Sequence, residues 1–180
     1  MSTKKTVPWL VAVCALAGLA GCGSDSATGT VPEGWATMTT ASVDVARPPS
    51  FTEQPAGERS KYNAAAATLK EGAKPVSMIT VQIGFTNADS VEEAAIGAEA
   101  GIALGSTLGE QQDVEVGGTK GKVQARRIDF DFTEKGDRYH GVIVAGLDAR
   151  KKSYAVRVDA LKGRLDEGDL DRIIDSITVK

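Results

Sequence analysis

The sequence predicts an α+β domain with a mostly antiparallel sheet of about six to seven strands and two main helices, 90–106 and 166–176. Three observations support this fold class. Apolar residues alternate with polar ones from Ile79 to Phe85, which is the period of a half-buried strand. A capping box at Ser90 begins a helix, and short turns separate the strand-like segments that follow residue 113.

The first 21 residues have the features of an export signal. Lys4 and Lys5 form a positive n-region, and the chain from Val7 to Cys22 carries no charge. This apolar run is interrupted early by Pro8 and is shorter than the roughly 20 residues that a membrane-spanning helix needs. A short apolar region behind a positive n-region is typical of a secretory signal peptide.

Cys22 lies at the end of this signal. The stretch Leu19-Ala20-Gly21-Cys22 resembles the lipobox of bacterial lipoprotein precursors. That resemblance implies that the thiol takes a diacylglycerol and that Cys22 becomes the mature N-terminus. The alternative is an ordinary cut after Ala15-Leu16-Ala17, which would leave Cys22 as an unpaired thiol because the other cysteine, Cys14, belongs to the signal. We expect Cys22 to be a membrane anchor, since two acyl chains give lasting attachment.

Removing the signal changes the charge balance of the chain. Without Lys4 and Lys5, 19 of the 21 basic residues remain against 24 acidic ones, which gives a formal net charge of −5. Bulk electrostatics therefore argue against a nucleic-acid partner. Residues 22–34, rich in Gly, Ser, Thr and Ala, are expected to form a flexible tether, and 35–180 a single domain.

The first part of the domain contains a predicted hairpin. A short alternating segment begins at Trp35, and a second strand at Val43–Val45 ends before two prolines. Ala64–Lys70 and Val76–Phe85 then flank a Gly- and Pro-containing turn, so they are predicted to pair as a hairpin.

The helix predicted over 90–106 carries glycine at every fourth position. Ser90 and Glu93 match a capping box, in which each side chain caps a backbone N–H of the first turn. Gly97, Gly101 and Gly105 would form one stripe along the helix. We expect this stripe to let the helix lie close against the sheet, because each glycine costs up to about 1 kcal/mol relative to alanine.

The remainder of the chain predicts an antiparallel meander and a terminal helix. Apolar residues recur at i, i+3, i+4 and i+7 from Leu170 to Ile177, which predicts an amphipathic helix over 166–176. Acidic residues crowd its first turn, where the helix dipole favours them. Short turns connect four strand-like segments before it: Asp113–Val116, Lys122–Thr133, Tyr139–Leu147 and Ser153–Ala160.

This order of elements resembles a known fold. With Val116-Gly117-Gly118, the segment Arg126–Phe132 and the closing Ile173–Val179, the chain looks like a PsbP-like α/β/α sandwich, in particular the LpqN-type lipoproteins of actinobacteria. The resemblance covers about residues 31–180. It implies a non-enzymatic module that binds other proteins, although a fold does not fix a function.

The residues give little support for catalysis or metal binding. His140 is the only histidine, and no nucleophile elbow accompanies it. A zinc site needs three or four ligands, which the mature chain does not offer in a recognisable spacing. Asp129 and Asp131 share a strand face with Arg127, which indicates a solvated ion-pair ladder. We therefore expect no catalytic residue, no cofactor and no metal ligand.

Five basic residues fall in two turns that alternate along the meander, so they are expected at one end of the sheet. This basic rim would meet an anionic partner, which could be an envelope protein, a lipid head group or a wall polymer. The alternative is that these are ordinary charged loops. The five residues are Lys120, Lys122, Arg150, Lys151 and Lys152.

Together these features predict a lipid-anchored binding module on the extracytoplasmic face of the cell membrane, without enzymatic activity, that binds protein partners. The alternative function is a carrier of a lipid or other apolar ligand. In that case the small residues of 94–105 would leave a groove between helix and sheet.

Overall fold

The protein is described by a computed structural model over residues 28–180, so Cys22 and the predicted signal lie outside the described residues. This part of the chain contains two α-helices, α1 (Val91–Glu99) and α2 (Glu167–Asp175), and a short 3-10 helix, Ala56–Glu58. Ten strands accompany them: β1 (Ala36–Thr39), β2 (Val43–Arg47), β3 (Thr52–Glu53), β4 (Asn63–Glu71), β5 (Lys74–Ile83), β6 (Thr107–Gly118), β7 (Val123–Glu134), β8 (Asp137–Leu147), β9 (Ser153–Leu161) and β10 (Thr178–Val179).

The strands form one sheet in the order β1-β2-β10-β6-β7-β8-β9-β5-β4-β3. The predicted hairpin β4–β5 and the meander β6–β9 are confirmed, and both are antiparallel. The expected count of six to seven strands is too low. β3 and β10 have two residues each, which is too short for an alternating pattern to be visible in the sequence.

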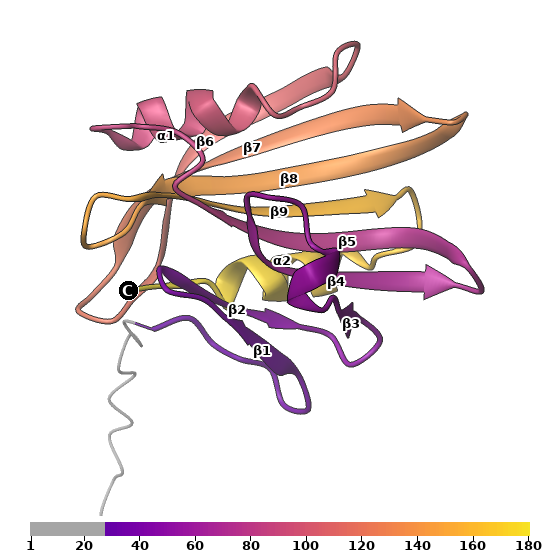
Figure 1. Cartoon of the computed structure of the whole chain (residues 1–180), viewed down its shortest axis with the longest axis horizontal. Helices are drawn as coiled ribbons and strands as arrows, with labels where there is room; N and C mark the ends of the chain where they lie inside the picture. Colours follow the sequence, from indigo (N-terminus) through magenta and orange to yellow (C-terminus); the bar gives the residue numbers. More distant parts are fainter. Residues whose placement is uncertain (1–27) are drawn as a thin grey trace, which may run out of the picture.

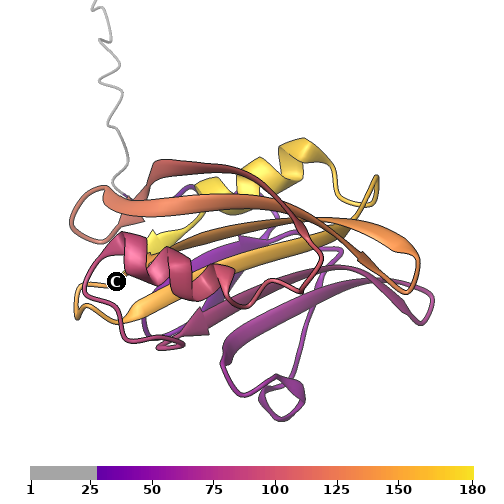
Figure 2. The same ribbon diagram turned by 90° about the horizontal axis from the view of Figure 1, so that it is seen from above.

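The sheet curls around the main hydrophobic core, and the two helices cover its opposite faces (Figures 1 and 2). Met38 of β1 belongs to the same buried cluster as Ala65 of β4, although these strands lie near opposite ends of the strand order. α2 covers this concave side and contributes Ile173 and Ile177, as its apolar period predicts. The layers are therefore helix, sheet and helix.

α1 covers the convex side, where Ile128, Phe130 and Phe132 of β7 form a smaller cluster with helix alanines. The helix begins as predicted, because the Ser90 hydroxyl accepts from the Glu93 N–H at 3.1 Å. The Glu93 carboxylate reaches back to the N–H of Asp89 at 2.7 Å, one residue beyond the expected partner.

The predicted length of this helix and its glycine stripe are wrong. α1 ends at Glu99 instead of 106, and Gly105 has a positive φ of 85°, which no α-helix contains. Gly97 is in the helix, but it faces the side chain of Thr86. Alanines contact the sheet instead: Ala95 and Ala98 are buried in the convex cluster. The helix is thus closely packed against the sheet as expected, but through alanines, and this contact leaves no room for the groove that the carrier alternative needs.

The folded domain extends upstream of Trp35. The N–H of Gly29 donates to the Thr178 hydroxyl at 2.9 Å, and the N–H of Thr30 donates to the carbonyl of Asp175 at 3.2 Å. A Cβ on Gly117 would overlap the backbone nitrogen of Gly29, so glycine permits this close approach. Among the described residues, Gly29 and Thr30 therefore contact the domain although they precede Trp35.

Candidate functional site

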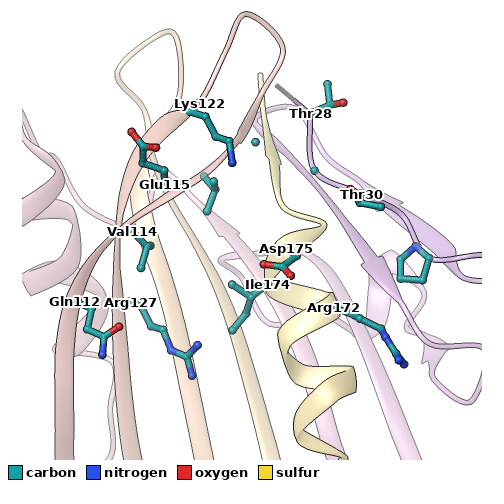
Figure 3. Close-up of a pocket in the computed structure, with 14 residues that line it drawn as sticks. Thr28, Thr30, Gln112, Val114, Glu115, Lys122, Arg127, Arg172, Ile174 and Asp175 are labelled. Atoms are coloured by element: carbon teal, nitrogen blue, oxygen red, sulfur yellow. The ribbon is translucent and has the colours of Figure 1, made fainter. Parts of the chain in front are cut away.

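An open cleft of about 620 Å³ lies between β6, α2 and the first described residues of the chain (Figure 3). This volume falls within the usual range of ligand pockets, roughly 300–1,000 Å³. In Figure 3 the side chains of Arg127 and Lys122 point into the space opposite Ile174 and Asp175 of α2. The cleft is lined by Thr28, Gly29, Thr30, Pro32, Gln112, Val114, Glu115, Val116, Gly117, Lys122, Arg127, Arg172, Ile174 and Asp175.

One wall of the cleft is the free edge of β6. On the side away from β7, β6 pairs only with β10, and only at Gly117 and Gly118; within residues 28–180 no other strand pairs with that edge. The pairing of β6 with β10 stops here because the residues that precede β10 form the helix α2 and cannot continue the strand.

Within residues 28–180, this edge of β6 presents backbone groups that no other strand pairs. The N–H of Thr119 donates to Val179 of β10 at 3.0 Å. Because hydrogen-bonding direction alternates along a strand, the N–H groups of Glu115 and Asp113 face the same side, beyond the end of β10. An unpaired edge of this kind can accept a further strand.

The charged groups of the cleft differ in how they are paired. The guanidinium of Arg127 donates twice to the Asp129 carboxylate, at 2.8 and 2.9 Å, and these hydrogen bonds raise the pKa of Arg127. Lys122 is exposed and forms no ion pair within the described part of the chain. The cleft is therefore polar, and Lys122 is the cation of its described lining that has no ion-pair partner among residues 28–180.

A second hollow of about 400 Å³ lies near the start of α2, and one residue of the predicted ion-pair ladder, Asp131, lines it together with His140 and Lys162. Asp131 accepts from Lys162 at 2.6 Å and lies 3.1 Å from Nδ1 of His140. The hydrogen bond from Lys162 and that from His140 hold the pKa of Asp131 below its usual range. Nε2 of His140 is 3.6 Å from Asp129. His140 thus lies between two carboxylates, and this arrangement is a salt-bridge network.

The described residues contain no group of three or more His, Cys, Asp or Glu side chains that could hold a metal ion. Asp166 instead caps α2 by accepting from the N–H of Gly168 at 2.9 Å. No helix over 28–180 is long and apolar enough to cross a membrane.

The structure brings the two turns of the basic rim to one end of the sheet, on either side of the C-terminus. Thr119 donates to Val179, and Ala149 donates to Lys180, each at 3.0 Å. Residues of both turns line one shallow hollow with these two C-terminal residues. All five predicted side chains are exposed: Lys120, Lys122, Arg150, Lys151 and Lys152.

Asp148 fixes the second of these turns. Its buried carboxylate accepts from the Ser42 hydroxyl at 2.7 Å and from the N–H groups of Arg150 and Lys152 at 2.8 Å each. Burial alone would raise the pKa of Asp148, but these three hydrogen bonds hold that pKa below its usual value. The carboxylate is thus part of the scaffold, and the cations around it are left exposed.

The cleft itself is not predictable from the sequence pattern. Arg127 pairs with Asp129, as the predicted ion-pair ladder requires, but nothing in the sequence indicates that α2 lies across the cleft from it. The cleft arises because β10, far along the chain, pairs with only two residues of β6. The one available signal was the polar composition of Gly109–Asp113, which leaves this part of β6 without an apolar face.

Helices on both faces of a mostly antiparallel sheet define this chain as an α+β protein with an LpqN-type fold. LpqN of Mycobacterium tuberculosis, a protein involved in cell envelope biogenesis, matches 81% of this chain and 90% of its own length. The TM-score is 0.56 and the sequence identity is 13%. The LpqN-type resemblance found in the sequence is confirmed at the level of the fold.

Other comparisons are more distant. The Ran-binding protein Mog1p of Saccharomyces cerevisiae shares 7% identity over 77% of this chain and 81% of its own, with a TM-score of 0.47. A protein of Bacteroides thetaiotaomicron shares 11% identity over 77% of this chain and 45% of its own, with a TM-score of 0.44. No family model and no curated protein matches the sequence.

Proposed function

We propose that the protein is a lipid-anchored binding module of the cell envelope, without enzymatic activity, whose cleft receives an extended segment of a protein partner. The observation that carries this proposal is the unpaired edge of β6 in the wall of a polar cleft. Strand addition to a free sheet edge is a recurring mode of peptide recognition, with affinity from backbone hydrogen bonds and specificity from alternate side chains.

The place in the envelope is supported by two independent features. The Leu19–Cys22 motif follows an export signal in the sequence. The fold is also that of LpqN, which is itself involved in cell envelope biogenesis. On this basis the chain is anchored through Cys22 on the extracytoplasmic face of the membrane, and the domain binds its partner there.

The carrier alternative is less well supported by the geometry. A lipid chain would need an enclosed apolar cavity, whereas Arg127, Lys122 and Asp175 line the cleft. The contact of α1 with the sheet is filled by buried alanines. A polar peptide fits the charged walls better than an acyl chain does.

Site-specific cross-linking in the native host tests the cleft. A photoreactive residue in place of Gln112, which is exposed in the cleft, should capture an envelope protein, whereas the same residue in place of exposed Arg138 at the far end of β8 should not. Glu115→Pro removes one outward N–H of the edge and should abolish the cross-link, and Glu115→Ala keeps that N–H and should retain it. Equal capture in both variants would contradict strand addition.

A further inference from the structure

The basic rim and the start of the described chain lie at the same end of the molecule. Gly29 packs against Gly117, which is three residues before Lys120. Thr28 and Lys122 line the same cleft. Figure 1 shows the chain entering the domain beside the C-terminus and the β6–β7 turn. Any anchor upstream of Thr28 is therefore attached at the rim end.

The short length of chain before Gly29 limits how far the rim can lie from the anchor. Cys22 precedes Gly29 by seven residues, and a fully extended chain covers at most about 25 Å over that length. The tether expected from the Gly- and Ser-rich sequence would have a root-mean-square span of roughly 15 Å over this length. Since the Debye length is about 8 Å at physiological salt, the rim can come within electrostatic range of the bilayer surface.

The charge at this end suits an anionic surface. No rim side chain forms an ion pair within the described residues, and all five are exposed. The neighbouring acids are largely satisfied: Asp148 is buried and hydrogen-bonded, and Lys180 holds Asp44 at 2.7 Å. Asp89 is an acid in the hollow next to Lys151 and Lys152. The rim is thus locally cationic on a chain of net negative charge.

We propose that the basic rim lies against the anionic phospholipid surface of the membrane that holds the anchor, and so orients the domain. This inference rests on the anchor proposed at Cys22. The rim turns, 119–122 and 149–152, contact lipid head groups, and the cleft opens beside them with the free edge of β6 running away from the membrane. The opposite end, with the β4–β5 and β7–β8 turns, points away from the membrane.

The test uses the chain from Cys22 to Lys180, in which Cys22 is the only cysteine. Its thiol is coupled to a maleimide lipid in vesicles of phosphatidylcholine alone or of an equal mixture with phosphatidylglycerol. Amide hydrogen exchange in 119–122 and 149–152 should slow on the mixed vesicles only, and high salt should reverse this. Equal exchange on both vesicles would overturn the proposal and leave a protein or polymer as the partner of the rim.

Charge reversal gives a matched control. Each basic residue near an anionic surface contributes about fivefold to binding, so the loss of three positive charges alone weakens binding by about 100-fold. Lys120→Glu, Lys122→Glu and Lys151→Glu together should therefore weaken binding of the uncoupled chain to mixed vesicles by more than about 100-fold. Lys70→Glu, Lys135→Glu and Arg138→Glu change the net charge equally at the opposite end. Lys135 also shares the positive φ of Lys151, so the two sets carry similar backbone strain. Equal weakening by both sets would overturn the proposal.

Coupling to the maleimide lipid allows the orientation of the domain to be tested separately from the proposed function on which it rests. Failure of the rim to contact mixed vesicles would contradict the orientation alone, because the coupling supplies an anchor regardless of natural acylation. The natural anchor is tested by the mass of the N-terminal peptide isolated from host membranes. An unmodified Cys22 would contradict the proposed function.

Discussion

Tyr154 is a buried side chain whose hydroxyl has no hydrogen-bond partner among the described residues. Burial raises the pKa of this phenol, so the group stays neutral. The ring belongs to the main core, but the hydroxyl has lost its hydration without compensation, which costs free energy. The Tyr154 side chain therefore stabilises the fold through the volume of its ring and not through its hydroxyl group.

Tyr154→Phe should therefore leave the free energy of unfolding unchanged or raise it by up to about 1 kcal/mol. Tyr154→Ala should lower that free energy by roughly 3–5 kcal/mol, because it leaves a large cavity. Urea denaturation of both variants measures the difference. A loss above about 1 kcal/mol in the phenylalanine variant would show that the hydroxyl is satisfied in solution.

Asp148 predicts a pH dependence of stability. Its pKa is lowered in the folded protein, so its contribution is present above the ordinary aspartate value of about 3.9 and is lost as pH falls through the lower folded value. Asp148→Asn should cost about 2 kcal/mol at pH 7 and flatten the loss of stability in acid. Urea denaturation between pH 7 and pH 3 measures both effects.

The matched control for Asp148 is Asp113→Asn, since the Asp113 side chain is 71% exposed although it pairs with Arg126. An exposed pair of this kind contributes about 0.5 kcal/mol or less. If the two variants showed the same stability profile against pH, the role assigned to the Asp148 hydrogen bonds would be wrong.

At the scale of elements, the β6–β10 seam holds the entry segment of the chain. Gly117→Ala would place a methyl group on the backbone of Gly29, so the alanine should displace residues 28–30 while β6 keeps its pairing with β7. We expect the amides of Gly29 and Thr30 to exchange with solvent much faster. Gly57→Ala, with open space around its Cβ position, is the control and should change neither amide.

The elements that the sequence predicted well have a period long enough to be read. Ile128, Phe130 and Phe132 of β7 alternate with polar residues, β8 contains a continuous apolar run from Val142 to Ala145, and α2 shows its apolar stripe over two turns. The repeating glycines predict a helix up to residue 106, but α1 ends at Glu99 and Gly105 has a positive φ of 85°. Local periodicity carries no information on such backbone reversals.

The cleft could not be predicted for a different reason. It depends on the parallel pairing of Thr178 and Val179 with Gly117 and Gly118, which are distant in the chain. A two-residue strand has no recognisable pattern, and pairing register depends on the whole fold. The position of the basic rim could be predicted because it requires only short turns and antiparallel neighbours, which the sequence does specify.

At the scale of the whole molecule, the described hollows are open and lined by charged side chains, while the main core is filled by buried apolar residues. We expect a native mass equal to that of the bare polypeptide when the chain from residue 22, with Cys22→Ser, is secreted from its own host. Native mass spectrometry before and after denaturation makes the comparison. Additional mass that is lost on denaturation would favour the carrier function.

The hydrogen bonds of Gly29 and Thr30 to the C-terminal part of the domain also have a mechanical consequence. If the chain is tethered at Cys22, a pull on the domain reaches the Gly29–Thr178 and Thr30–Asp175 hydrogen bonds before any strand of the large sheet. These two hydrogen bonds would break first, and the segment between Cys22 and the folded domain would become a few residues longer. Under tension the domain would therefore gain reach from the bilayer while β6–β9 stays folded.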